Sequence, residues 1–171
     1  MKKTLIIALS CLAVLFAACK KPVEPTPEPV DYAPNYVGNY IGQFILSINS
    51  MNNQAVSNMA FPIDGIGMDI AKGEEINTIT ATVTVENESH QTTGTATADK
   101  ADFGTVHLVI DKPDQNYYFN LDLIMEGSKP ESDTLIIVGT FSGNGNFTMP
   151  TGDVMLLDEV SGDVIGKIVK Q

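Results

Sequence analysis

The amino-acid sequence predicts an all-β fold. We expect an antiparallel up-and-down meander of eight or nine strands that closes into a barrel, with a two-sheet sandwich as the alternative. From residue 39 to residue 169, apolar and polar residues alternate along most segments, which is the period of a half-buried strand. The links between these segments are short and rich in Gly, Asn, Asp and Pro, as between neighbouring antiparallel strands. No segment keeps helical spacing over ten residues.

The first three expected strands span 39–48, 59–70 and 76–86. In the first strand, Tyr40 and Phe44 share a face and alternate with polar residues. In the second strand, the alternation slips at Asp64 and Gly65, which predicts a β-bulge. The third strand has a threonine at every second position from 78 to 84, which predicts a solvated face.

The remaining expected strands span 90–98, 103–111, 117–126 and 134–142, followed by two separate apolar runs at 153–158 and 163–169. The first of these is rich in small residues, and the next two alternate strictly. The segment 134–142 is apolar on both faces, which predicts a central strand covered on both sides. The glycine-rich stretch 139–145 predicts a hairpin, because no helix follows it to form a phosphate-binding loop.

The alternation assigns thirteen side chains to the core face, and a slip of one residue would reverse every assignment. They are Tyr40, Phe44, Leu46, Ile79, Val83, Val106, Leu108, Ile110, Phe119, Leu121, Leu123, Ile137 and Phe141.

The amino-terminal part of the chain predicts export. Residues 1–18 combine two lysines, an apolar run from Leu5 to Ala18 and small residues at the end, as in a cleaved signal peptide. The run is too short to cross a bilayer, which takes about twenty residues. Residues 19–34 continue with Cys19 and a proline-rich stretch that favours a stiff, extended tether. Residues 35–171 then form a single domain, large enough for a core without disulfides.

The residues around the cleavage site resemble the lipobox of bacterial lipoproteins. Ala17 and Ala18 precede Cys19, although Phe16 stands where that family usually has leucine. The resemblance implies that the chain is cut before Cys19, that its thiol carries a lipid and that its new amino terminus is acylated. It also implies the outer membrane, on its periplasmic face or at the cell surface, because nothing after Cys19 resembles a signal for retention in the inner membrane. The acidic tag for export to the surface is missing, which favours the periplasmic face. The alternative is an ordinary cleaved signal peptide with a chance cysteine.

The first strand carries a further resemblance. It contains the pattern Y-x-G-x-Y-x-G, formed by Tyr36, Gly38, Tyr40 and Gly42. Together with the lipobox and the tether, this pattern resembles the calycin-like β-barrel lipoproteins of Gram-negative bacteria, which are relatives of the lipocalins. Tyr40 would stand at the tryptophan of the lipocalin G-x-W turn. The chain has no arginine to pack over that ring, so Lys167 or Lys170 would replace it.

A barrel of this kind implies a binding protein for a small apolar ligand or lipid, held at the membrane by its anchor. The residues expected to line the cavity are Tyr40, Phe44, Met68, Leu108, Phe119, Leu121, Met125 and Phe141. Methionines adapt to irregular apolar ligands, although core packing is their commoner use. The alternative function is a structural or adhesive lipoprotein of the cell envelope that acts through its surface or an exposed strand edge.

Composition argues against other functional classes. The net charge of −11 and the lack of arginine argue against a nucleic-acid partner. The chain has no G-x-S-x-G motif and no free cysteine nucleophile after maturation, so we expect no enzyme and no cofactor. A metal site would need His90 and His107 together with Asp99, Asp102 or Asp111, and we expect ordinary solvent-facing histidines instead. The sequence leaves the oligomeric state open.

Overall fold

The computed structural model describes residues 27–86, 88–149 and 151–171. The signal peptide, Cys19 and the first part of the tether lie outside the described residues, so the predictions made for them stay predictions. Among the described residues, no helix is long and apolar enough to cross a membrane.

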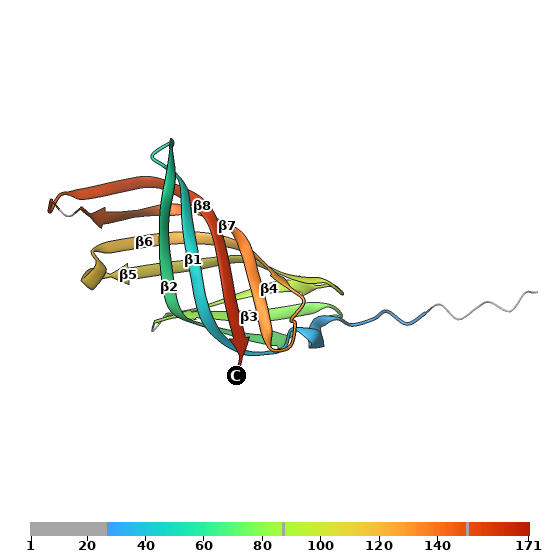
Figure 1. Cartoon of the computed structure of the whole chain (residues 1–171). Coiled ribbons are helices and arrows are strands. Elements are labelled where there is room, and N and C mark those ends of the chain that lie inside the picture. The colour runs from blue at the N-terminus through green and yellow to red at the C-terminus, as the bar shows by residue number, and fades with distance from the viewer. Residues whose placement is uncertain (1–26, 87, 150) are drawn as a thin grey trace, which may run out of the picture.

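Eight antiparallel strands form a closed barrel in simple up-and-down order, as the sequence predicts (Figure 1). They are β1 (Gly38–Met51), β2 (Gln54–Lys72), β3 (Thr78–Val85), β4 (Glu88–Ala96), β5 (Lys100–Lys112), β6 (Tyr117–Ser128), β7 (Thr134–Thr148) and β8 (Val154–Lys170). Pairing of β1 with β8, for example Ile45 with Ile165, closes the ring. The two-sheet alternative is therefore not adopted. The ladder is shortest between β4 and β5, which pair at Thr95–Asp102 and Ala96–Ala101.

All thirteen residues assigned to the core face are buried, so the predicted register is confirmed. The predicted bulge is also confirmed. The β1–β2 register shifts between Gly42 and Gln43, opposite Gly65, whose φ of 71° lies in the left-handed region where glycine is favoured. The threonines of β3 point outward and are half-buried, alternating with its four buried residues.

Two expectations about the last strands are wrong. The stretch 139–145 is not a hairpin but lies inside β7, and the runs 153–158 and 163–169 are one continuous strand, β8. The glycines let β7 pass close to β6: a Cβ on Gly143 would lie 2.1 Å from the carbonyl oxygen of Asn120. The pairing of β7 with β8 shifts register at Asp158 and Glu159. Both residues are exposed, and the residues on either side of them, Leu157 and Val160, face inward.

A short 3-10 helix, η1 (Ala33–Asn35), precedes β1 at one end of the barrel. The next residue, Tyr36, is fully buried, and its hydroxyl donates to the carbonyl oxygen of Thr97 at 3.1 Å. The Tyr40 hydroxyl donates in turn to the carbonyl oxygen of Tyr36 at 3.0 Å. Of the two lysines expected here, Lys170 pairs with Tyr40 across β1 and β8 and donates to the Val37 carbonyl at 2.8 Å, whereas Lys167 faces outward. The tether therefore enters at a closed end of the barrel.

Candidate functional site

The eight residues expected to line a ligand cavity come from five strands and meet inside the barrel. Each is at most 3% exposed, and all belong to one hydrophobic core cluster with no buried polar residue among the described side chains. The structure thus brings these eight residues together inside the barrel. Whether they bind a ligand depends on the space between them.

Side chains fill the barrel interior. A void inside it is lined by Leu46, Ile48, Phe61, Phe119, Leu121 and Phe141. Its narrow shape leaves no room for a water molecule. Pockets that hold drug-sized ligands measure about 300–1,000 Å³. In this conformation the core residues serve packing, and the void is too small for a small-molecule ligand.

Aromatic packing closes the barrel above this void. The Phe61 ring of β2 reaches across to β6 and packs edge-to-face on Tyr117 and Phe119, with ring centroids 5.3 Å and 5.2 Å apart. Other partly buried apolar side chains pack against the core, among them Met51, Met59 and Met155. The sequence did not identify Phe61 as a residue of this closure, because its partners Tyr117 and Phe119 lie on a strand distant in the chain.

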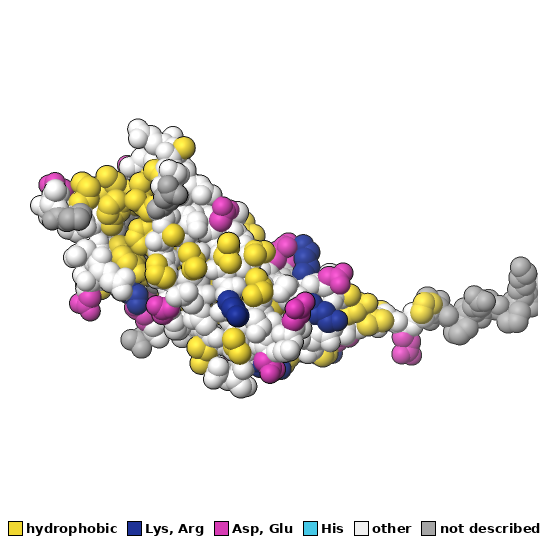
Figure 2. Space-filling model, in the orientation of Figure 1, with side chains coloured by type: hydrophobic (Ala, Val, Ile, Leu, Met, Phe, Trp, Pro, Cys, Tyr) yellow, Lys and Arg dark blue, Asp and Glu magenta, His cyan; other side chains and the backbone are white. Residues whose placement is uncertain are grey.

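The most unusual feature lies on the outer surface. Seven large apolar side chains form what we call the outer apolar band: Ile41 and Ile45 of β1, Ile165 and Val169 of β8, Ile136 and Val138 of β7, and Ile124 of β6. Each is between 38% and 58% exposed. Cross-strand pairing aligns Pro62, Ile45, Ile165 and Val138 in one row over four strands. Figure 2 shows hydrophobic side chains spread across this face with a lysine among them.

The band occupies one side of the barrel. On the opposite hairpin, β3 and β4, the outward positions carry Thr78, Thr80, Thr82, Thr84, Gln91, Thr93 and Thr95, and the exposed large hydrophobic residues among the described residues include none from these two strands. Contiguous exposed apolar area on a soluble domain marks an interaction surface more often than chance exposure does. The expectation that 134–142 is covered on both faces is thus wrong, since its outer face is open in the single chain.

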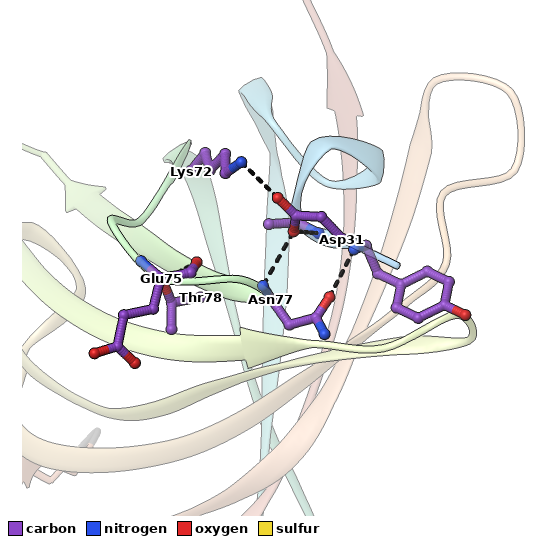
Figure 3. A network of polar contacts seen from close by, with 7 residues as sticks. Asp31, Lys72, Glu75, Asn77 and Thr78 are labelled. Carbon is purple, nitrogen blue, oxygen red and sulfur yellow. Dashed lines mark hydrogen bonds and ion pairs between the residues drawn. The ribbon is translucent and has the colours of Figure 1, made fainter. Parts of the chain in front are cut away.

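The start of the tether is fastened to the barrel by a polar clamp (Figure 3). The Asp31 carboxylate accepts from the Asn77 backbone N–H at 3.0 Å and pairs with Lys72 at 2.5 Å. The Asn77 side chain accepts in return from the Tyr32 backbone N–H at 2.6 Å. The hydrogen bond from Lys72, together with that from Asn77, lowers the pKa of Asp31, so this carboxylate is charged at neutral pH. Residues 31–34, assigned to the tether from sequence, therefore lie on the barrel.

The structure brings the two histidines together. His90 on β4 and His107 on β5 have ring centroids 5.8 Å apart, and His107 Nδ1 lies 2.9 Å from Asp122 on β6. The carboxylate beside His107 is thus Asp122, not one of the three aspartates considered from sequence. Only the strand register reveals this, because His107 and Asp122 are cross-strand partners. Within the described ranges, no group of three or more His, Cys, Asp or Glu side chains has the arrangement of a metal site.

Comparisons with known proteins add little to this picture. No family model and no curated protein matches the chain. A similar solved structure is the crystal structure of a protein of unknown function from the DUF3598 family of Nostoc punctiforme, at 8% sequence identity and a TM-score of 0.32. The match covers 86% of this chain and 53% of that protein, so the chain spans about half its length.

Proposed function

We propose that this protein is a lipid-anchored lipoprotein of the cell envelope, of the calycin-like barrel type, that acts through the outer surface of its barrel as a structural or adhesive module. The proposal places it in the outer membrane, on the periplasmic face or at the cell surface, and assigns it no reaction and no cofactor. The outer apolar band is the observation that carries the proposal. A filled interior supports it further, because it leaves the surface as the region available for binding.

Anchoring is supported by the order of features along the chain. The lipobox-like Ala17-Ala18-Cys19 is followed by a proline-rich tether, and the described end of that tether is clamped to the closed end of the barrel by Asp31. Two or three acyl chains hold a protein stably on a membrane, whereas one does not. The clamp would connect the lipid-anchored tether to the folded domain at a defined point.

A small apolar ligand or lipid is the second candidate function. The observation in its favour is the void beneath Phe61, which is lined only by apolar side chains. To admit a ligand, the Phe61 ring would have to leave its contacts with Tyr117 and Phe119. The outer apolar band would have no part in this function, and so the two candidates can be separated by experiment.

Replacing Cys19 with alanine is expected to release the protein from the membrane fraction, because the variant lacks the thiol that would carry the lipid. Membrane and soluble fractions of cells that produce the full-length protein are compared by immunoblot after a high-salt wash. A Ser10→Ala variant in the apolar signal run is the control and should stay with the membranes. If the Cys19→Ala protein also stays there after washing, the anchor lies elsewhere.

Surface action is tested with a photo-crosslinking amino acid placed in the full-length protein in intact cells. At Ile124, in the outer apolar band, we expect a discrete crosslinked product, because this side chain is 58% exposed beside other apolar residues. At Thr82, on the threonine face, we expect none. Native mass spectrometry of the same protein is expected to show no bound small molecule. Equal crosslinking at both sites, or a retained apolar molecule, would contradict surface action and favour the second candidate.

A further inference from the structure

We propose that the outer apolar band is a homodimer interface, in which a second copy of this chain packs face to face across a two-fold axis that crosses β8 at Ile165. This inference rests on the proposed function, since it names the partner of the surface assigned there. A closed two-fold interface is self-complementary, because the same patch is used by both copies.

The charges of β8 are arranged symmetrically about Ile165. Its outward residues around this point are Asp163, Ile165 and Lys167, followed by Val169, so opposite charges stand two residues to either side of the isoleucine. At about 3.3 Å per residue, each charge lies about 7 Å from Ile165 along the strand. A two-fold axis perpendicular to β8 reverses the strand, and therefore sets Lys167 of one copy opposite Asp163 of the other. The same operation repeats the ion pair on the other side of the axis.

Both charges are available at the surface. Lys167 takes part in none of the ion pairs between described residues. Asp163 is exposed and accepts a hydrogen bond from the Asn49 side chain at 2.8 Å through one of its two carboxylate oxygens, which fixes the carboxylate near the band. An ion pair at the edge of an interface sets register and orientation more than affinity. These two residues would thus select the antiparallel arrangement.

On β1, β8 and β7 the apolar residues of the band lie in the row of Ile165 and on its Lys167 side, whereas Ser47 and Thr140 flank Asp163 on the other side. Ile45 of β1 and Val138 of β7 are the direct cross-strand neighbours of Ile165 on its two sides. Ile41 pairs with Val169 one step beyond Lys167, and Ile136 pairs with Lys167 itself. The band therefore has an apolar centre three strands wide with charges beside it, which is the distribution of a protein interface with a dry core and a polar rim. Two sheet faces pack in this way about 10 Å apart.

The direction of the tether fits two copies in one membrane. In Figure 1 the described start of the tether, from residue 27 onward, leaves the barrel sideways, across the direction of β8. A two-fold rotation about an axis perpendicular to β8 reverses the direction of the strand. A direction parallel to the axis, such as that of the tether, stays unchanged. Both tethers therefore leave the dimer on the same side. Anchoring in one membrane would raise the effective concentration of each copy for the other.

A second copy suits the band better than a lipid surface does. Glu126, which is paired with Lys100 at 2.6 Å, lies beside Val138 in the β6–β7 ladder. Asp163, two residues from Ile165 on β8, has no lysine partner among the described residues. Burial of carboxylates among lipid chains is costly unless they are paired. The partner copy supplies a lysine for Asp163, whereas a lipid surface would leave this carboxylate unpaired.

Disulfide trapping of the full-length protein in intact cells tests the proposal. With Ile165→Cys, the two thiols lie at the axis, and we expect a dimer on a non-reducing gel that dithiothreitol converts to monomer. The matched control is Thr82→Cys, an outward position on the threonine face, which should stay monomeric. Thermal melting of each purified variant verifies that it is folded. If Ile165→Cys gives no more dimer than Thr82→Cys, the homodimer is rejected.

Charge exchange tests the position of the axis. In the Ile165→Cys background, Asp163→Lys alone and Lys167→Asp alone should each lower the trapped dimer by about fivefold or more, because both symmetry-related pairs become repulsive. The double exchange Asp163→Lys with Lys167→Asp should restore trapping. Failure of restoration overturns the proposed axis. A discrete crosslink from Ile124 to a different protein, without trapping at Ile165, rejects the homodimer and leaves the proposed surface function intact.

Discussion

Replacing Phe119 with alanine is expected to lower the free energy of unfolding by about 3–5 kcal/mol, the range for large aromatic residues in a packed core. The Phe119 side chain is 1% exposed, packs on Phe61 at 5.2 Å between ring centroids, and lines the narrow void inside the barrel. Its removal would leave a cavity at this place. The surrounding strands belong to a closed barrel and have little freedom to collapse into the space.

Urea denaturation of the purified protein measures this change. The matched control is Asn120→Ala on the same strand, because Asn120 points outward and lies outside the outer apolar band. We expect the control to alter the free energy of unfolding by at most about 0.5 kcal/mol, as for most surface sites. A loss below about 0.5 kcal/mol for Phe119→Ala would show that β6 has the opposite face inward, and the core assignment would then fail for the whole strand.

The core could be predicted from sequence because its signal is local. In β6, every second residue from Tyr117 to Met125 is apolar, and all five of these residues are buried. The short links that follow each strand specify antiparallel neighbours, so the order of the meander also follows from the sequence. Closure of β1 on β8 was predicted from the strand count and not from any local pattern, because this pairing joins the two ends of the domain.

The wrong expectations for 139–145 and 134–142 concern β7. Its composition is typical of a turn and of a covered strand, but its structure is decided by close packing at glycine and by its place in a single-layered barrel. Gly143 and Gly145 are typical of a turn in a single sequence, yet in β7 they give the space for a close crossing over β6. The segment 134–142 is apolar on both faces, which is typical of a covered strand, but a single barrel has no second layer to cover Ile136 and Val138. The outer apolar band can therefore be recognised only when the order and pairing of β1, β8, β7 and β6 are known.

The polar contacts of the site could not be predicted, because they join residues that are distant in the sequence. Asp31 and Lys72 are 41 positions apart in the chain, and the sequence gives no sign that they meet. The same holds for His107 and Asp122, which are brought together by the β5–β6 register. The residues expected to line a cavity lie inside the barrel, but the volume between them depends on the side chains of all eight strands. A filled interior cannot be derived from alternation alone.

Tyr36→Ala is the second substitution with a large expected effect, a loss of about 3–5 kcal/mol in the free energy of unfolding if its ring behaves as other fully buried aromatic rings do. Tyr36 is fully buried next to η1, at the end where the tether enters. Its hydroxyl bonds to the Thr97 carbonyl, and burial raises the pKa of this tyrosine, so the hydroxyl is neutral and able to donate. Removal of the ring would open the closed end beside Tyr40.

Two further variants separate the ring from the hydroxyl. Tyr36→Phe keeps the ring and loses one hydrogen bond, so we expect it to cost about 0.5–1.5 kcal/mol. Tyr118→Ala, at a half-buried outward position of β6, is the matched tyrosine control and should cost clearly less than Tyr36→Ala. All three are compared with the natural sequence by urea denaturation, and hydrogen exchange of the Ala96 and Tyr40 amides reports whether the loss is centred at the closed end. A cost for Tyr36→Ala no greater than that for Tyr118→Ala would mean that η1 and Tyr36 do not seal the barrel, and the tether would then have no fixed point of attachment at this end.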